Sequence, residues 1–197
     1  MGYLWSNIAS TTAAVTNRLV TSTNMKVGAY TVVNSGLSPW GGPFTVTATI
    51  SAVTGNDTAG TLTVVGVGLS GQALTEVITL TDGVGGTGTK IFRSVTSITG
   101  AGWVINTGND TIVVGVGDGS YVMGSGTLYG VVLNNSVAAT VVISDARGTI
   151  ATIPASAAAG TFYRYEVACS GYCKISTTST NDVTILHEST LPIYTAT

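Results

Sequence analysis

The stretch TVTATISA at residues 45–52 alternates strictly between hydroxyl-bearing and apolar side chains. Its even-numbered positions carry Val, Ala, Ile and Ala, whereas its odd-numbered positions carry Thr or Ser. Successive side chains of a β-strand point to opposite faces of the sheet, so one face of this strand is expected to be buried and the other solvated. The pattern predicts a strand in an antiparallel sheet.

Short runs rich in Val, Ile and Thr continue on both sides of this stretch and are separated by Gly, Asn, Asp and Pro. Such runs are typical of strands, and turn signals about every ten residues are typical of a β-sandwich or barrel. The sequence therefore predicts an all-β fold with strands at residues 29–34, 44–53, 61–67, 73–81, 89–96, 102–106, 110–116, 126–134, 139–145, 148–153, 161–168, 172–177 and 182–187.

A Gly-rich stretch, GDGSYVMGSG at residues 117–126, divides these strands into two groups. We predict a first β domain at residues 29–118, a hinge at 119–125 and a second β domain at 126–197. Residues 1–28 mix small polar and apolar side chains without a clean period, which predicts an extended N-terminal arm that reaches onto a neighbouring molecule. The expected architecture is two small antiparallel β-sandwich or barrel-like domains preceded by this arm.

The composition favours a protein whose surface is covered in an assembly. Hydrophobic residues make up 44% of the 197 residues, and charged residues only 8%. Soluble domains average about a quarter charged residues. A surface built largely of Thr, Ser, Asn and Gly is poorly defended against association. Burial against copies of the chain or a larger particle is therefore favoured, and an ordinary secreted β domain is the alternative.

The charge pattern argues against nucleic acid and membrane partners. The 7 Lys and Arg residues are scattered, whereas nucleic-acid binding usually requires a basic patch. The apolar runs are strand-length and broken by Gly and Thr, so no membrane span is predicted. The first residues lack the basic and apolar regions of a secretory signal, which predicts synthesis in a cytoplasm.

The sequences TGNDT and VVGVG each occur twice, with TGNDT at residues 54–58 and 107–111. Asn and Asp bond their own backbone in turns, so TGNDT predicts a turn ahead of a Val-rich strand. Calcium-binding β-helices need such phrases in tandem, so neither Asp57 nor Asp110 is predicted to bind metal. The GVGGTG at 83–88 matches a dinucleotide fingerprint but is followed by strand-like sequence rather than a helix, so no cofactor is predicted.

No catalytic constellation is recognisable. The chain has no G-x-S-x-G motif and one histidine, His187, which is expected to form a surface pair with Glu188 or to contact a neighbouring subunit. The 9 acidic residues give no pair that the sequence singles out for glycoside hydrolysis. We predict a non-enzymatic protein without catalytic residues.

Two cysteines, Cys169 and Cys173, bracket the sequence CSGYC. A disulfide is geometrically possible if they face each other across a hairpin. In a cytoplasmic product we expect them to stay reduced, with one packed and one exposed. A metal site is not predicted, because C-x3-C has no second pair of ligands.

The three tryptophans differ in their expected roles. Trp103 is expected in the core, Trp40 in an exposed Pro/Gly loop, and Trp5 in the arm, where a large apolar side chain suits an anchor onto a partner. A sugar-binding face is the alternative use of such side chains.

Two segments resemble structural proteins of tailed bacteriophages. Residues 88–117 (GTKIFRSVTSITGAGWVINTGNDTIVVGVG) contain the T-G-A-G-W turn and the G-N-D-T-I-x-V-G strand common in these proteins. Residues 126–177 are similar to small virion β modules, with a G-x-L-x-G-V strand, a D-x-x-G turn at Asp145–Gly148 and an aromatic strand. The resemblance covers less than half the chain and carries no catalytic residues.

The resemblance implies a virion component, first a decoration (cement) protein on the capsid exterior that binds the major capsid protein and copies of itself, often as a homotrimer. A head or tail fibre and a connector protein are the alternatives within this group. Deletion of residues 1–25 is then expected to abolish particle binding and leave the fold intact. The residues expected to contact the partner are Leu4, Trp5, Arg18, Val20 and Trp40.

A free glycan- or receptor-binding β module is the alternative from another class. It would present aromatic side chains on one exposed face, as sugar-binding surfaces do. The residues expected to form such a face are Trp40, Tyr121, Tyr129 and Tyr163.

Overall fold

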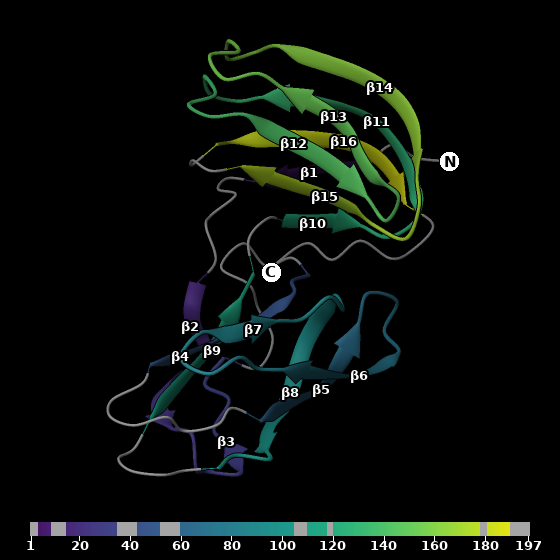
Figure 1. Cartoon of the computed structure of the whole chain (residues 1–197). Coiled ribbons are helices and arrows are strands. Elements are labelled where there is room, and N and C mark those ends of the chain that lie inside the picture. Colours follow the sequence, from purple (N-terminus) through teal and green to yellow (C-terminus); the bar gives the residue numbers. More distant parts are fainter. Residues whose placement is uncertain are drawn as a thin grey trace. The chain divides into compact units, whose positions relative to one another are not determined.

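The computed structural model describes residues 4–8, 15–34, 43–51, 60–104, 110–117, 120–177 and 181–189. Every regular element in these ranges is a β-strand, so the predicted all-β class is confirmed (Figure 1). The strands form four antiparallel sheets and two compact sandwich-like units. The N-terminal unit contains β2 to β9, and the C-terminal unit contains β1 and β10 to β16.

The N-terminal unit pairs two four-stranded sheets. One has the order β2 (Val15–Asn24), β9 (Thr111–Val116), β4 (Val46–Ser51) and β7 (Gly85–Thr87). The other has the order β3 (Ala29–Tyr30), β8 (Phe92–Ala101), β5 (Thr61–Gly68) and β6 (Ala73–Thr79).

The alternating stretch behaves as its pattern predicts. On β4 the side chains of Val46, Ala48 and Ile50 are buried, whereas the hydroxyl-bearing positions between them are half-buried or exposed. The first VVGVG sequence lies on β5 and the second covers the end of β9 and Gly117, and each of these strands is central in its sheet. A central strand is covered on its apolar face and paired along both edges, which suits such Val-rich sequence.

The two sheets of the N-terminal unit are joined by the backbone of two buried phenylalanines. Phe44 precedes β4, Phe92 begins β8, and each backbone N–H donates to the other's carbonyl oxygen at 2.8 Å. Both side chains are fully buried, at 0% exposure. This bridge places two large rings in the core at the point where the sheets meet.

The C-terminal unit also has two four-stranded sheets. One has the order β1 (Leu4–Ile8), β16 (Val183–Ser189), β11 (Gly126–Leu133) and β14 (Phe162–Cys169). The other has the order β10 (Ser120–Met123), β15 (Cys173–Thr177), β12 (Val141–Asp145) and β13 (Gly148–Ile153). Apolar side chains of both sheets share one core, which includes Leu128, Val131 and Ile185 from the first and Val141, Ile143 and Ile175 from the second.

The expectation of an extended N-terminal arm is wrong for the described residues. Residues 4–8 form β1, which pairs with β16, and residues 15–24 form β2, which pairs with β9. Leu19 and Val20 of β2 are buried in the core. The pairing of β2 shifts register twice, and such irregularity removes the two-residue period by which a strand is recognised in sequence.

The segment between the domains also differs from expectation. The contact pattern divides the units after Gly117, close to the predicted boundary, but residues 120–123 of the predicted hinge form β10 and pair with β15. The predicted strand at 102–106 has one bridging residue, Val104, in its described part. After the GVGGTG sequence the chain continues into β8 rather than a helix.

Candidate functional site

Strand β1 carries two of the residues expected to contact a partner, Leu4 and Trp5. It pairs with β16 in regular register, with Trp5 opposite Leu186, and lies at the edge of its sheet. The indole of Trp5 is 58% exposed. A strand at a sheet edge presents backbone N–H and C=O groups along its outer side, so β1 offers both hydrogen-bonding groups and a large apolar side chain.

The other expected contact residues are not on β1. Arg18 and Val20 lie on β2, in the other unit, and Trp40 lies outside the described residues. Val20 is 2% exposed and belongs to the core, which removes it from the surface candidates. Arg18 is partly exposed, and its backbone oxygen accepts a hydrogen bond from Asn34 Nδ2 at 3.1 Å.

Deletion of residues 1–25 is therefore not a clean test of partner binding. It would remove β1 and β2 together with the buried side chains of Leu19, Val20 and Met25. Loss of one buried aliphatic side chain typically lowers the free energy of unfolding by about 2–5 kcal/mol. The N-terminal unit of the truncated chain is therefore expected to unfold. A point substitution on β1 is the sharper test.

The edge strand β1 is less protected than two other edges of the described sheets. Edge strands commonly carry charges or bulges that discourage pairing with another chain. On β14 the exposed Arg164 and Glu166 form an ion pair beside a bulge, and on β6 the Lys90 ammonium donates to the Thr75 carbonyl at 2.7 Å. The sequence LWSNI of β1 has no charged residue, and its pairing has no bulge.

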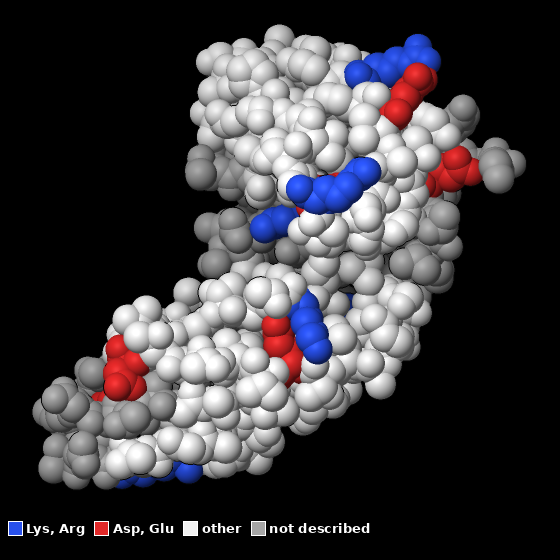
Figure 2. All heavy atoms as spheres, turned by 45° about the vertical axis from the view of Figure 1, so that its right-hand side comes forward, with Lys and Arg blue, Asp and Glu red and all other residues white. Residues whose placement is uncertain are grey.

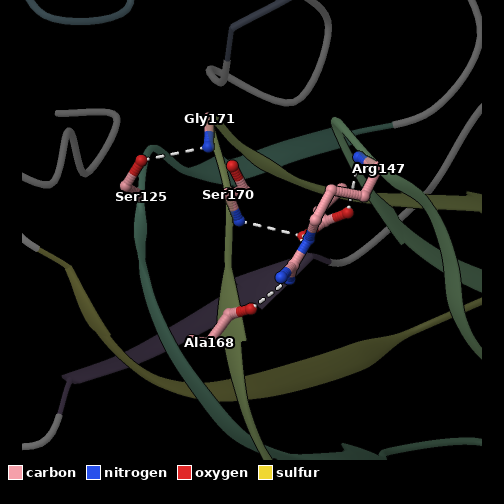
Figure 3. A network of polar contacts seen from close by, with 6 residues as sticks. Ser125, Arg147, Ala168, Ser170 and Gly171 are labelled. Carbon is pink, nitrogen blue, oxygen red and sulfur yellow. Dashed lines mark hydrogen bonds and ion pairs between the residues drawn. The ribbon is translucent and has the colours of Figure 1, made fainter.

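A buried carboxylate organises one end of the C-terminal unit (Figure 3). Asp145, at the end of β12, is 3% exposed and accepts hydrogen bonds from Arg147 N at 2.8 Å and from Ser170 N at 2.9 Å. The Arg147 guanidinium donates to Asp145 Oδ2 through Nε at 2.9 Å and Nη2 at 2.6 Å, and Nη2 also reaches the Ala168 carbonyl. The network joins the β12–β13 turn to the connection between β14 and β15.

These contacts favour the charged form of Asp145. The Arg147 side chain is the main cause, and the two backbone N–H donors add to it against the cost of burial, so the pKa of Asp145 falls from 3.8 to about 2. The sequence signal for this site is the D-x-x-G turn, because an Asp at the start of such a turn bonds the backbone two residues on. The network holds a turn in place.

His187 and Glu188 occupy different environments. His187 lies on β16 between β1 and β11 and is 0% exposed, so the expected surface pair is wrong. Burial lowers the pKa of His187 from 6.5, which favours the neutral imidazole. Glu188 instead accepts a hydrogen bond from the Tyr129 hydroxyl at 2.9 Å.

The structure does not favour an aromatic glycan platform in the described residues. Tyr129 is half-buried, and its hydroxyl is engaged by Glu188, while Tyr163 packs against the core of the C-terminal unit. Trp103 is half-buried, and Trp40 and the side chain of Tyr121 lie outside the described part of the chain. Among the described residues, the aromatic side chains that remain exposed are Trp5 and Phe162, on opposite edge strands of one sheet.

Among the described residues, no group of three or more His, Cys, Asp or Glu side chains is placed to hold a metal ion. The same residues contain no helix that is long and apolar enough to cross a membrane. No protein-family model, curated protein or solved structure matches the chain. The fold and the surface chemistry are therefore the observations that bear on function.

Proposed function

We propose that the chain is a non-enzymatic structural component of a tailed-phage particle, and that it stabilises the capsid by binding the outer surface of the shell as a decoration protein. Its partners are the major capsid protein and copies of itself, with a homotrimer as the proposed oligomer. It is made in the cytoplasm of the bacterial host and resides on the capsid exterior. The resemblance of residues 88–117 and 126–177 to virion modules supports this proposal.

The observation that carries the proposal is the nearly uncharged surface of two all-β units. Charged residues make up 8% of the chain, and Figure 2 shows those of the described residues as a few separate spots among uncharged atoms. Net charge and interspersed charges normally keep small β domains apart in solution. A protein that is held in many copies on a particle instead gains from weak contacts, because linked copies bind with increased avidity.

Replacing Trp5 with alanine is expected to weaken binding to shells by at least about tenfold. A large aromatic side chain at the centre of an interface typically contributes more than about 1.4 kcal/mol, which corresponds to that factor. The measurement is cosedimentation of the purified variant with capsid shells that lack this protein. Phe162→Ala is the matched control, because Phe162 is 47% exposed on the opposite edge strand of the same sheet.

The result for the two variants decides whether β1 is the contact. Unchanged binding of Trp5→Ala, or an equal loss in both variants, would exclude a specific role for the β1 edge. Circular dichroism of each variant checks that the exposed substitution leaves the strands intact.

The copy number per particle tests the proposed function itself. Quantitative mass spectrometry of purified virions should give this chain in fixed proportion to the major capsid protein. A small copy number that does not scale with the shell would indicate a fibre or connector instead. Absence from purified particles would overturn the virion assignment and favour a free binding module.

A further inference from the structure

The two cysteines lie at the crossing from one sheet of the C-terminal unit to the other. Cys169 is the last residue of β14, and Cys173 is the first residue of β15. Both are free thiols, and they are 4% and 0% exposed respectively. The expectation that one of them is exposed is therefore wrong.

The fold places the two thiols in one core cluster. Both thiols belong to the core cluster of the unit, and only three residues separate them along the chain. The three-residue connection between them is held by its backbone: Ser170 N donates to Asp145 Oδ2 at 2.9 Å, and Gly171 N donates to Ser125 Oγ at 3.0 Å. Gly171 has a φ of 75°, which a glycine adopts without strain. A fixed turn thus holds the two cysteines at its two ends.

The surroundings make the two sulfurs unequal. The hydrogen bond from Cys173 lowers the pKa of Cys169, and the charge of Arg147 acts in the same direction against burial and Asp145. The same hydrogen bond and burial raise the pKa of Cys173 well above 9.0. These directions favour a thiolate on Cys169 and a protonated thiol on Cys173. A thiolate is the reactive form of cysteine.

We propose that Cys169 and Cys173 form an oxidation site at which hydrogen peroxide produces an intramolecular disulfide, with Cys169 as the attacking sulfur and Cys173 as the resolving thiol. The Cys169 thiolate attacks one peroxide oxygen, the O–O bond breaks, and a sulfenic acid and hydroxide form. The Cys173 sulfur then attacks the sulfenic sulfur, its proton leaves with the departing oxygen, and water is released. Overall, two thiols and one peroxide give one disulfide and two waters.

The burial of the sulfurs selects a small oxidant. Glutathione disulfide must bring a bulky sulfur into line with the attacking thiolate, which the 4% exposure of Cys169 does not allow. Hydrogen peroxide is close in size to water. The site is independent of the proposed virion function, but it is consistent with a protein that is made in a reducing cytoplasm and later meets oxidising surroundings.

The test is oxidation of the reduced full-length chain by hydrogen peroxide, followed by removal of the peroxide and alkylation under denaturing conditions. Intact-mass analysis is expected to show a species that has lost two hydrogen atoms and takes up no alkyl group. Reduction should restore two alkylatable thiols. The monomer band on a non-reducing gel establishes that the disulfide is intramolecular.

Two serine variants assign the roles of the sulfurs. In Cys173→Ser the sulfenic acid of Cys169 should persist and be captured by dimedone. In Cys169→Ser the remaining Cys173 should react with peroxide at least about tenfold more slowly, because it holds its proton more tightly. Equal reaction rates of the two variants would overturn the assignment of the nucleophile.

The wild-type chain alone decides whether the site exists, even if a variant fails to fold. Glutathione in the same tube serves as the control for active peroxide. If glutathione is oxidised while both cysteines remain alkylatable, the thiols are inert core residues and the proposal fails. Oxidation to sulfinic acid without disulfide formation would also overturn it, because Cys173 would then not resolve the sulfenic acid.

Discussion

Replacing Phe92 with alanine is expected to destabilise the N-terminal unit by about 4 kcal/mol. The ring is 0% exposed, so its removal leaves a cavity in a packed core as well as forfeiting its transfer from water. Phe92 pairs with Gly68 of β5 and bridges Phe44 ahead of β4, so the site lies where both sheets of this unit are joined. The loss of stability should therefore affect both sheets of this unit rather than β8 alone.

Urea unfolding of the full chain measures this loss, and hydrogen exchange followed by mass spectrometry assigns it to β2 to β9. Val77→Ala is the control, because Val77 lies on β6 of the same unit and is 60% exposed. Its expected effect is below about 0.5 kcal/mol. Similar midpoints for the two variants would contradict the role of the Phe92 ring in the core of this unit.

The sequence predicts the positions of some strands closely. The expected strand at 61–67 corresponds to β5 at Thr61–Gly68, and the expected strand at 148–153 coincides with β13. On β5 every second residue is buried, so local alternation and tertiary burial agree. Where these two levels agree, the fold class and strand positions follow from the residues alone.

The sequence does not predict which strand lies beside which, because strand order depends on contacts between distant parts of the chain. Strand β1 pairs with β16, from the other end of the sequence, and thereby places His187 in the interior of a sheet. The local sequence around His187 and Glu188 indicates only a strand next to polar residues. The position of β1 at a sheet edge cannot be predicted for the same reason. The sequence shows that Trp5 is apolar, but it does not show that Trp5 lies exposed on an edge strand.

The sequence predicts a turn at Asp145 but not the hydrogen-bond network around it. Asp145 is followed by Gly148 in the D-x-x-G pattern, which indicates a bend between two strands. The donor that connects the turn to the rest of the unit, Ser170 N, lies 25 residues further on. A carboxylate with such a distant partner stabilises tertiary structure. Its replacement should show how much free energy of unfolding it contributes.

Replacing Asp145 with asparagine is expected to destabilise the C-terminal unit by about 2 kcal/mol. The amide lacks the charge and cannot accept from the Arg147 guanidinium, Arg147 N and Ser170 N as the carboxylate does. Buried hydrogen bonds to a charged group contribute about 1.5–3 kcal/mol, and solvent reduces this value because the Arg147 side chain is 61% exposed. Glu166→Gln makes the same chemical change at an exposed ion pair of the same unit and should cost less than about 0.5 kcal/mol.

The pH dependence of the stability difference between the wild type and Asp145→Asn identifies the charge of Asp145 as its cause. The pKa of Asp145 is about 2 in the folded chain against 3.8 for the ordinary carboxyl group, so the unfolded chain takes up the proton first as the pH falls. The stabilisation is complete above pH 3.8, declines below that value and is lost as the pH falls through about 2. Urea midpoints of the wild type and Asp145→Asn should therefore converge across this range. A difference that stays constant down to pH 2 would show that the substitution acts through packing, because a purely steric effect does not depend on the protonation of Asp145.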